Sequence, residues 1–169
     1  SGNRALGRDV SQARRRKPDM QWTAADMSRL LTAADWVPLL AGVDAVVNAA
    51  GALQDGPRDQ LDAIHRRSVE ALVAACEQTG VRRLVQISAV GADLQSDSAF
   101  FRTKAEGDRA VASSSLDWTI LRPGLVIAPA AYGGTALLRA LAVFPWIVPA
   151  VLADRPIQTV SVRDVEEAV

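Results

Sequence analysis

VDAVVNAA, from Val43 to Ala50, is a short apolar run bounded by Gly42 and Gly51. A run of this length, rich in valine and closed by glycine, predicts a β-strand that is buried on both faces. Strands of that kind are typical of parallel sheets whose two faces are both covered by helices. The stretch therefore indicates an α/β protein.

The same pattern continues on both sides of this run. Further strands are expected at Arg4–Gly7 (RALG), Met20–Ala25 (MQWTAA), Arg82–Val90 (RRLVQISAV), Asp117–Gly124 (DWTILRPG) and in PIQTVSV. Residues with helical spacing lie between them, and helices are expected at about Ala33–Leu40, Asp59–Gln78, Ser98–Ser113 and after Ser161. Alternating strands and helices with short connections predict one doubly wound domain with a parallel sheet, covering residues 1–169.

The composition of the chain indicates which binding partners and which cellular location to expect. The 169 residues carry 19 basic and 19 acidic side chains, so no excess of charge indicates a nucleic acid or an anionic membrane as partner. Apolar runs are interrupted before the roughly 20 residues that a membrane span needs. The single cysteine, Cys76, lies in an apolar run and is expected to be a buried thiol. We expect a soluble, cytoplasmic protein.

Small and polar residues follow three of the predicted strands: Asn48-Ala49-Ala50-Gly51, Ser88-Ala89-Val90-Gly91 and Pro123-Gly124. In an open parallel sheet the ligand crevice lies beyond the carboxyl ends of the strands. Small side chains there let a flat ligand approach the backbone, although at any single strand they serve equally to form a tight turn. Three such ends together favour a ligand cleft. No group of Cys, His and carboxylate residues has the spacing of metal ligands.

The order of these motifs resembles the short-chain dehydrogenase/reductase superfamily, and most closely its atypical, NmrA-like and sugar-epimerase-like members. The motifs are NAAG (Asn48–Gly51), ISAVGA (Ile87–Ala92), FFRTKAE (Phe100–Glu106) and LRPG (Leu121–Gly124), and the resemblance extends from about Ala5 to Val169. It implies a Rossmann-like NAD(P)-binding fold and an oxidoreductase or epimerase-like activity on a small molecule that the residues do not identify.

The resemblance also implies a set of cofactor-binding residues: Arg8, Asp26, Asn48, Ala49, Ala50, Gly51, Ser88, Lys104 and Pro123. In that family the NAAG turn faces the adenine-ribose half of the dinucleotide, Asp26 matches the acid at the adenine, and Lys104 matches the lysine at the nicotinamide ribose. Arg8 matches a cation that pairs with a 2′-phosphate, so NADP is favoured over NAD, although the adjacent Asp9 leaves the choice open.

The expected catalytic residues are Ser88, Lys104 and His65. Ser88 occupies the family's catalytic serine position, but the family's tyrosine, four residues before the lysine, is replaced by Phe100. A phenyl ring has no proton to transfer, so the usual general acid/base is missing. His65 is a candidate substitute, and its alternative interpretation is a histidine on a helix surface.

The family's opening strand and glycine-rich phosphate loop are absent from the sequence. In the usual strand order this strand lies between RALG and VDAVVNAA, so we expect an N-terminally incomplete fold with two unpaired strand edges. The segment at about 125–169 is expected to be the substrate side. Its apolar residues, including a helix from Gly133 to Val143, line a pocket or pack in the core.

Three functions compete at this stage. The first is an NAD(P)-dependent oxidoreductase or epimerase-like enzyme in which water, Ser88 or His65 replaces the phenol. The second is a non-catalytic NAD(P)-binding redox sensor or regulator, which the Phe100 replacement favours. The third is an interaction module without a nucleotide site. The residues leave the oligomeric state open, but members of the family that this sequence resembles often form homodimers through the helices at about 59–78 and 98–113.

Overall fold

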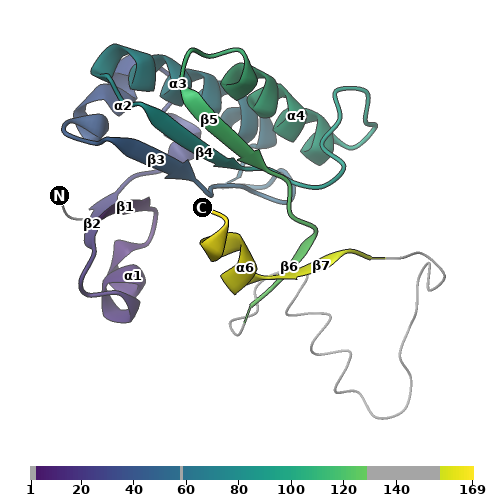
Figure 1. Ribbon diagram of the computed structural model, residues 1–169, viewed down its shortest axis with the longest axis horizontal. Helices are drawn as coiled ribbons and strands as arrows, with labels where there is room; N and C mark the ends of the chain where they lie inside the picture. Colours follow the sequence, from purple (N-terminus) through teal and green to yellow (C-terminus); the bar gives the residue numbers. More distant parts are fainter. Residues whose placement is uncertain (1–2, 58, 129–156) are drawn as a thin grey trace, which may run out of the picture.

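The computed structural model describes residues 3–57, 59–128 and 157–169 (Figure 1). Its elements in chain order are β1 (Arg4–Gly7), α1 (Val10–Arg16), β2 (Gln21–Ala24), η1 (Met27–Arg29), α2 (Ala33–Leu40), β3 (Ala45–Asn48), η2 (Ala63–Arg67), α3 (Ser68–Thr79), β4 (Arg83–Ile87), α4 (Ala99–Ala112), β5 (Asp117–Leu121), β6 (Leu125–Ile127), β7 (Thr159–Ser161) and α6 (Val162–Glu167).

Every strand pairing in the described ranges is parallel, as predicted. The strands β3, β4 and β5 form one sheet in that order, and β1 with β2 and β6 with β7 form two smaller sheets. Backbone bonds extend the β4–β5 ladder past the strand ends, because Ser88 N donates to Leu121 O at 2.8 Å and Val90 N to Pro123 O at 3.1 Å. The segments that follow β4 and β5 therefore leave the sheet side by side.

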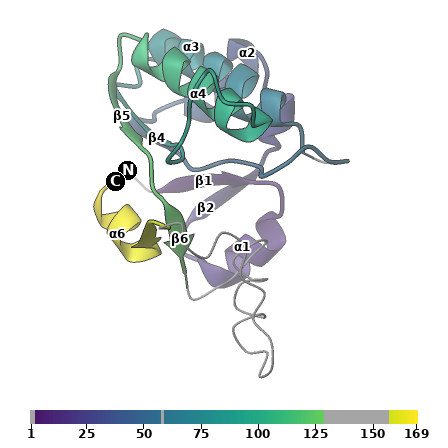
Figure 2. The same ribbon diagram turned by 90° about the vertical axis from the view of Figure 1, so that its right-hand side faces the viewer.

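Helices lie on both sides of the strands. In both views α2, α3 and α4 lie on one side and α1 and α6 on the other, with the strands between them (Figures 1 and 2). This arrangement confirms the predicted doubly wound α/β architecture. No helix in the described ranges is long and apolar enough to cross a membrane.

The main core lies between α2, α3 and the sheet. Leu72, Ala75 and Cys76 of α3 are almost fully buried, and their i, i+3, i+4 spacing places them on one face of the helix. Trp36 and Leu40 of α2 pack in the same cluster. Burial raises the pKa of the Cys76 thiol to about 11, which keeps it protonated. The expectation of a buried, unreactive cysteine is confirmed.

The prediction that Val43–Ala50 is buried on both faces was wrong. Val46 packs against the core, but the side chain of Val47 on the opposite face is 50% exposed. The helices α2, α3 and α4 cover only one face of this sheet, and β1 and β3 belong to separate sheets. That a further strand fills this gap stays a prediction.

Most predicted elements match the observed ones within two or three residues, but the helix expected at Asp59–Gln78 begins differently. Its first part contains a π-helical turn, η2, before the regular α3. At the other end, α6 begins with a capping box in which Ser161 and Asp164 bond each other's backbone. The helix expected from Gly133 and the chain's only tyrosine, Tyr132, lie outside the described residues.

Candidate functional site

Lys104 of α4 joins the carboxyl ends of β3 and β4. Its side chain is 5% exposed, and its Nζ donates to the carbonyl oxygens of Ile87 at 3.1 Å and of Ala50 at 3.5 Å. Burial lowers the pKa of this amine, and the nearby Asp108 carboxylate opposes that shift. An ammonium has three donors, and within the described residues it finds two acceptors, one of them at the limit of a hydrogen bond. The charge is therefore incompletely satisfied.

Gly51 lets the turn after β3 pack closely against Lys104 and His65. A Cβ atom at this position would lie 3.2 Å from Lys104 Nζ and 3.4 Å from His65 Nε2. The residue itself is exposed, as is Ala49 in the same turn. The turn is therefore exposed to solvent on one side, while the Cβ side of Gly51 faces the Lys104 ammonium and the His65 ring. In an open parallel sheet, ligands bind beyond strand ends of this kind.

His65 is buried beside Lys104, so its interpretation as a helix-surface histidine was wrong. Its side chain is 1% exposed, and η2 turns it inward between the turn after β3 and α4. Its Nε2 accepts the Ala52 N–H at 3.1 Å, and its Nδ1 lies 3.0 Å from Thr103 Oγ1. Because Nε2 accepts, Nδ1 carries the proton. Burial and the Lys104 charge lower the pKa of His65 to about 4, so the ring is neutral at pH 7.

Gly107 lets α4 approach η2. A Cβ atom at this position would overlap with the carbonyl oxygen of His65. Only glycine therefore allows this distance between the two helices, and the distance in turn sets how closely Thr103 and Lys104 approach His65.

Phe100 lies at the same site but offers no hydrogen-bonding group. Its ring meets that of His65 edge to face, with the centroids 5.5 Å apart, and meets that of Phe101 with the centroids 5.1 Å apart. The Phe101 ring lies against Gly91, 3.5 Å from where a Cβ would be. The place where the resemblance implies a tyrosine is thus an aromatic contact with the buried imidazole.

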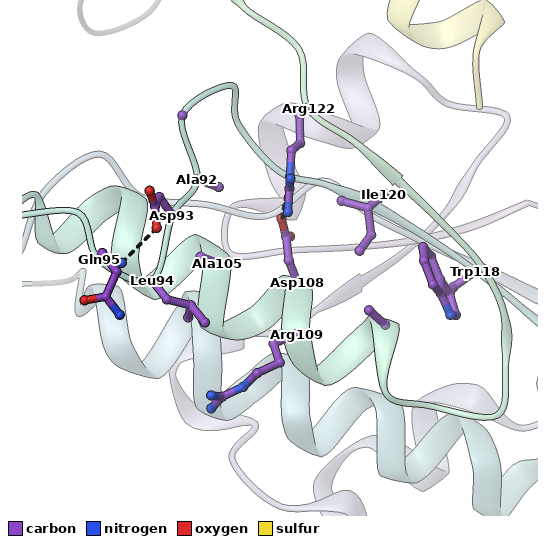
Figure 3. A pocket seen from close by; sticks show the side chains of 12 residues that line it. Ala92, Asp93, Leu94, Gln95, Ala105, Asp108, Arg109, Trp118, Ile120 and Arg122 are labelled. Atoms are coloured by element: carbon purple, nitrogen blue, oxygen red, sulfur yellow. Dashed lines mark hydrogen bonds and ion pairs between the residues drawn. The ribbon is translucent and has the colours of Figure 1, made fainter.

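Ser88 is bonded to a second buried charge, Asp108. Its Oγ donates to Asp108 Oδ2 at 2.8 Å, and Arg122 donates to the same oxygen through Nε at 3.0 Å and a terminal nitrogen at 2.9 Å. Figure 3 shows Asp108 and Arg122 pointing toward each other beside a pocket of about 950 Å³ between the loop after β4, α4 and β5. The Ser88 hydroxyl therefore has an acceptor that the sequence did not indicate.

Asn48 shapes the turn after β3. Its Nδ2 donates to Gln86 Oε1 at 2.8 Å and its Oδ1 accepts the Ala50 N–H at 3.1 Å, in a side chain that is buried. These bonds fix the turn that carries Ala50 and Gly51 to Lys104. Pro123 ends β5 next to the segment after β4, with its carbonyl bonded to Val90 N.

Arg8 and Asp26 follow the ends of β1 and β2, in the separate two-stranded sheet. Arg8 forms an ion pair with Asp59 at 2.7 Å, and Asp9 caps α1 by accepting from the backbone N–H groups of Ser11 and Gln12. The Asp26 carboxylate accepts from the backbone and hydroxyl of Ser28, which lower its pKa. The structure thus brings Asn48, Ala50, Gly51, His65 and Lys104 together, with Ser88 and Pro123 at the adjoining strand ends, while Arg8 and Asp26 lie on the other sheet.

Sequence reasoning missed Thr103, Asp108 and Arg122. The spacing of Lys104 and Asp108, one helical turn apart, could have indicated that both lie on the buried face of α4. No spacing rule links Thr103 to His65, because their bond joins residues 38 positions apart. Among the described residues no group of His, Cys, Asp and Glu could hold a metal ion.

Comparisons with known proteins agree with this geometry. A family model described as NAD(P)H-binding matches residues 3–140. The UPF0659 protein YMR090W of Saccharomyces cerevisiae is 34% identical over 88 residues, which are 48% of this chain and 38% of that protein. The chain thus spans well under two thirds of that relative.

Two solved structures have the same fold. One is described as an NAD-dependent epimerase/dehydratase from Bacillus halodurans, with 25% identity, a TM-score of 0.60, and coverage of 77% of this chain and 62% of that one. The other is the dTDP-glucose 4,6-dehydratase DesIV of Streptomyces venezuelae with NAD bound, with 16% identity, a TM-score of 0.76, and coverage of 96% and 59%. The chain belongs to the NAD(P)H-binding family and has the Rossmann-like fold of the short-chain dehydrogenase/reductase superfamily.

Proposed function

We propose that this chain binds NAD(P) across the ends of β3 and β4 and acts as an oxidoreductase, with Lys104 at the nicotinamide ribose. The observation that carries the proposal is the buried Lys104 ammonium, which two carbonyl oxygens of the described residues hold next to the exposed turn at Gly51. Ribose hydroxyls are acceptors of the kind that such an ammonium lacks. A charge-assisted hydrogen bond formed away from water is worth about 1.5–3 kcal/mol.

The proposed cofactor residues fall into two groups. The turn from Asn48 to Gly51 and the ends at Ser88 and Pro123 form the part of the site next to Lys104, and Asp26 and Arg8 form the adenine side. Arg8 favours NADP, because a guanidinium suits a phosphate. Its ion pair with Asp59 means that a 2′-phosphate would compete with that carboxylate. Arg8→Ala should therefore weaken NADPH binding more than NADH binding.

The bound dinucleotide would supply or accept a hydride. Among the described residues, the two side-chain proton donors next to Lys104 are already engaged: the Ser88 hydroxyl with Asp108, and the His65 Nδ1–H with Thr103. Phe100 has no proton, and a positioned acid contributes about 10²–10⁴-fold to a carbonyl reduction. The site therefore favours acceptors whose reduced form is weakly basic, such as quinones, over simple ketones.

Phe100 also supports a second candidate function. A protein that binds NAD(P)H without turning it over, and reports redox state through that binding, needs Lys104 and the NAAG turn but no phenol. The Phe100 ring lies against His65, where it stabilises the site without taking part in chemistry.

Titration and turnover separate the candidates. Intact protein is titrated with NADPH and NADH by calorimetry, and NADPH consumption is then measured with a quinone and with a saturated cyclic ketone, alongside Phe100→Tyr. Micromolar or tighter binding with quinone turnover supports the oxidoreductase. Binding without turnover, with activity only in Phe100→Tyr, supports the sensor. If neither dinucleotide gives saturable binding, both candidates fail.

A further inference from the structure

Three hydrogen bonds in series connect the turn after β3 to α4 through His65. The Ala52 N–H donates to Nε2, Nδ1 bonds the Thr103 hydroxyl at 3.0 Å, and that hydroxyl donates to Ala99 O at 2.8 Å. The carbonyl of Phe100 lies 3.2 Å from the same hydroxyl. Because the single hydroxyl proton goes to these carbonyls and Nε2 accepts from Ala52, Thr103 Oγ1 accepts from Nδ1–H. The His65 ring therefore has one tautomer, in which Nδ1 carries the proton and Nε2 is the acceptor.

The hydrogen bonds of His65 lie next to those of the Lys104 ammonium. Thr103 precedes Lys104 in α4, and Ala52 lies two residues after Ala50, whose carbonyl accepts from Nζ at 3.5 Å. The bond between Nζ and Ala50 therefore spans the same two segments that the imidazole already joins. If the imidazole were absent, that long bond and the one to Ile87 would be the remaining polar contacts holding the ammonium to the strand ends.

The neutral state of the ring is essential to this arrangement. A protonated imidazole has two donors, so Nε2 could no longer accept the Ala52 N–H, and a second cation would lie beside the Lys104 ammonium. The charged groups whose fields act on the ring are Lys104, on α4, and Asp55, in the loop after β3. Burial and the Lys104 charge both lower the pKa of His65, and the Asp55 charge raises it.

We propose that His65 is a positioning residue of the dinucleotide site, whose neutral ring ties the turn at Ala50–Ala52 to α4 and so fixes the Lys104 ammonium for the ribose. This inference rests on the proposed function. It assigns His65 no proton transfer, because both ring nitrogens are engaged with the protein. In a core-packing role only the shape of the His65 ring would matter. In the positioning role, its tautomer and its hydrogen bonds determine how tightly the dinucleotide binds.

The first test is a direct reading of the ring. His65 is the chain's only histidine, so the imidazole ¹⁵N resonances of uniformly labelled intact protein belong to it alone. At pH 7 we expect the neutral tautomer with the proton on Nδ1. A protonated ring, or a neutral ring with its proton on Nε2, would overturn the inference without any variant being made.

The second test is a pair of variants at Thr103. Thr103→Val keeps the shape of the side chain but removes the acceptor, and Thr103→Ser keeps the hydroxyl. We expect the Kd for NADPH to rise about tenfold in Thr103→Val and to stay within about twofold in Thr103→Ser. If both variants fold and bind NADPH as the parent does, His65 is a core residue and the inference fails. If the parent itself does not bind a dinucleotide, the proposed function fails, whatever the tautomer is.

Discussion

Two buried charges lie one helical turn apart on α4, and the protein satisfies them differently. Asp108 accepts three bonds from side chains on Oδ2, one from Ser88 and two from Arg122, at 2.8–3.0 Å, while its buried Oδ1 has no partner among the described residues. Lys104 has two backbone carbonyls, at 3.1 and 3.5 Å. The Arg122 guanidinium compensates the buried Asp108 charge, whereas no described carboxylate bonds the Lys104 ammonium. Because a buried charge is costly unless it is paired, we assign Asp108 a structural role and consider Lys104 the group available to a ligand.

The two regions also differ in what surrounds them. The Lys104 region contains the exposed turn at Gly51, the neutral His65 and the aromatic Phe100. The Asp108 region contains the ion pair with Arg122, whose side chain is half exposed, and it borders the pocket of about 950 Å³. Removing a group from the first region should therefore change ligand binding, and removing one from the second should change stability.

The largest effect is expected where the two regions meet, at Gly107. Gly107→Ala should lower the free energy of unfolding by about 3 kcal/mol, because the added methyl overlaps with the His65 carbonyl and the backbone of η2 must move. Urea unfolding measures the change. Gly56→Ala is the matched control, since a Cβ there meets nothing within 4 Å. Equal effects in the two variants would show that α4 and η2 are not in close contact.

Acid should loosen the Lys104 region through His65. The pKa of the ring is about 4 in the folded chain against 6.5 as its ordinary value, so between these values the unfolded chain binds more protons. Stability is therefore lost as pH falls from 6.5 toward 4, by about 2 kcal/mol at pH 5 from this group alone.

The measurement compares unfolding free energies from pH 7 to 4.5 in the parent and in His65→Gln, which has no titrating ring. Carboxylates contribute to both curves, so the difference between them reports His65. A difference that does not change with pH would contradict the lowered pKa.

Lys104→Met should affect binding but not stability. The loss of a charge-assisted hydrogen bond, worth about 1.5–3 kcal/mol, predicts a Kd for NADPH that is about 10–100-fold higher. The thermal midpoint should not fall, because an apolar side chain of similar length removes the cost of burying an incompletely satisfied charge. Calorimetric titration and thermal unfolding measure the two quantities.

The control for this variant is Lys17→Met, at the chain's only other lysine, which is exposed at the end of α1. It should leave both quantities unchanged. Unaltered NADPH binding in Lys104→Met would remove Lys104 from the proposed site.

Asp108→Asn should reverse the pattern of Lys104→Met, because it should lower stability and leave NADPH binding nearly unchanged. Its effect should be the smallest of the four. The amide keeps an oxygen for Ser88 or Arg122 but loses the charge, and water recovers part of the loss at the half-exposed Arg122. We expect a stability decrease of about 1–2 kcal/mol and a Kd for NADPH within about threefold of the parent. A larger change in the Kd than in stability would place Asp108 in the ligand site and end the contrast with Lys104.

Local sequence determined the helices and strands, and the strand ends that form the candidate site. The run at Ala45–Asn48, the helix at Ala33–Leu40 and the ends at NAAG, ISAVGA and LRPG were all identifiable, because side-chain periodicity and turn residues act over a few positions. The lysine at position 104 and the absence of a nearby phenol were also evident from the sequence, since they depend on spacing within one helix.

The tertiary structure alone decided which partners these residues have. The inward turn of His65, its bond to Thr103, the pairing of Asn48 with Gln86 and the pairing of Ser88 with Asp108 join residues 20–38 positions apart. The exposure of Val47 likewise depends on which helices cover its face. Periodicity reports which side of an element is apolar, but a hydrogen-bond partner is fixed only when separate elements pack together, and so the chemistry of this site could not be read from the chain alone.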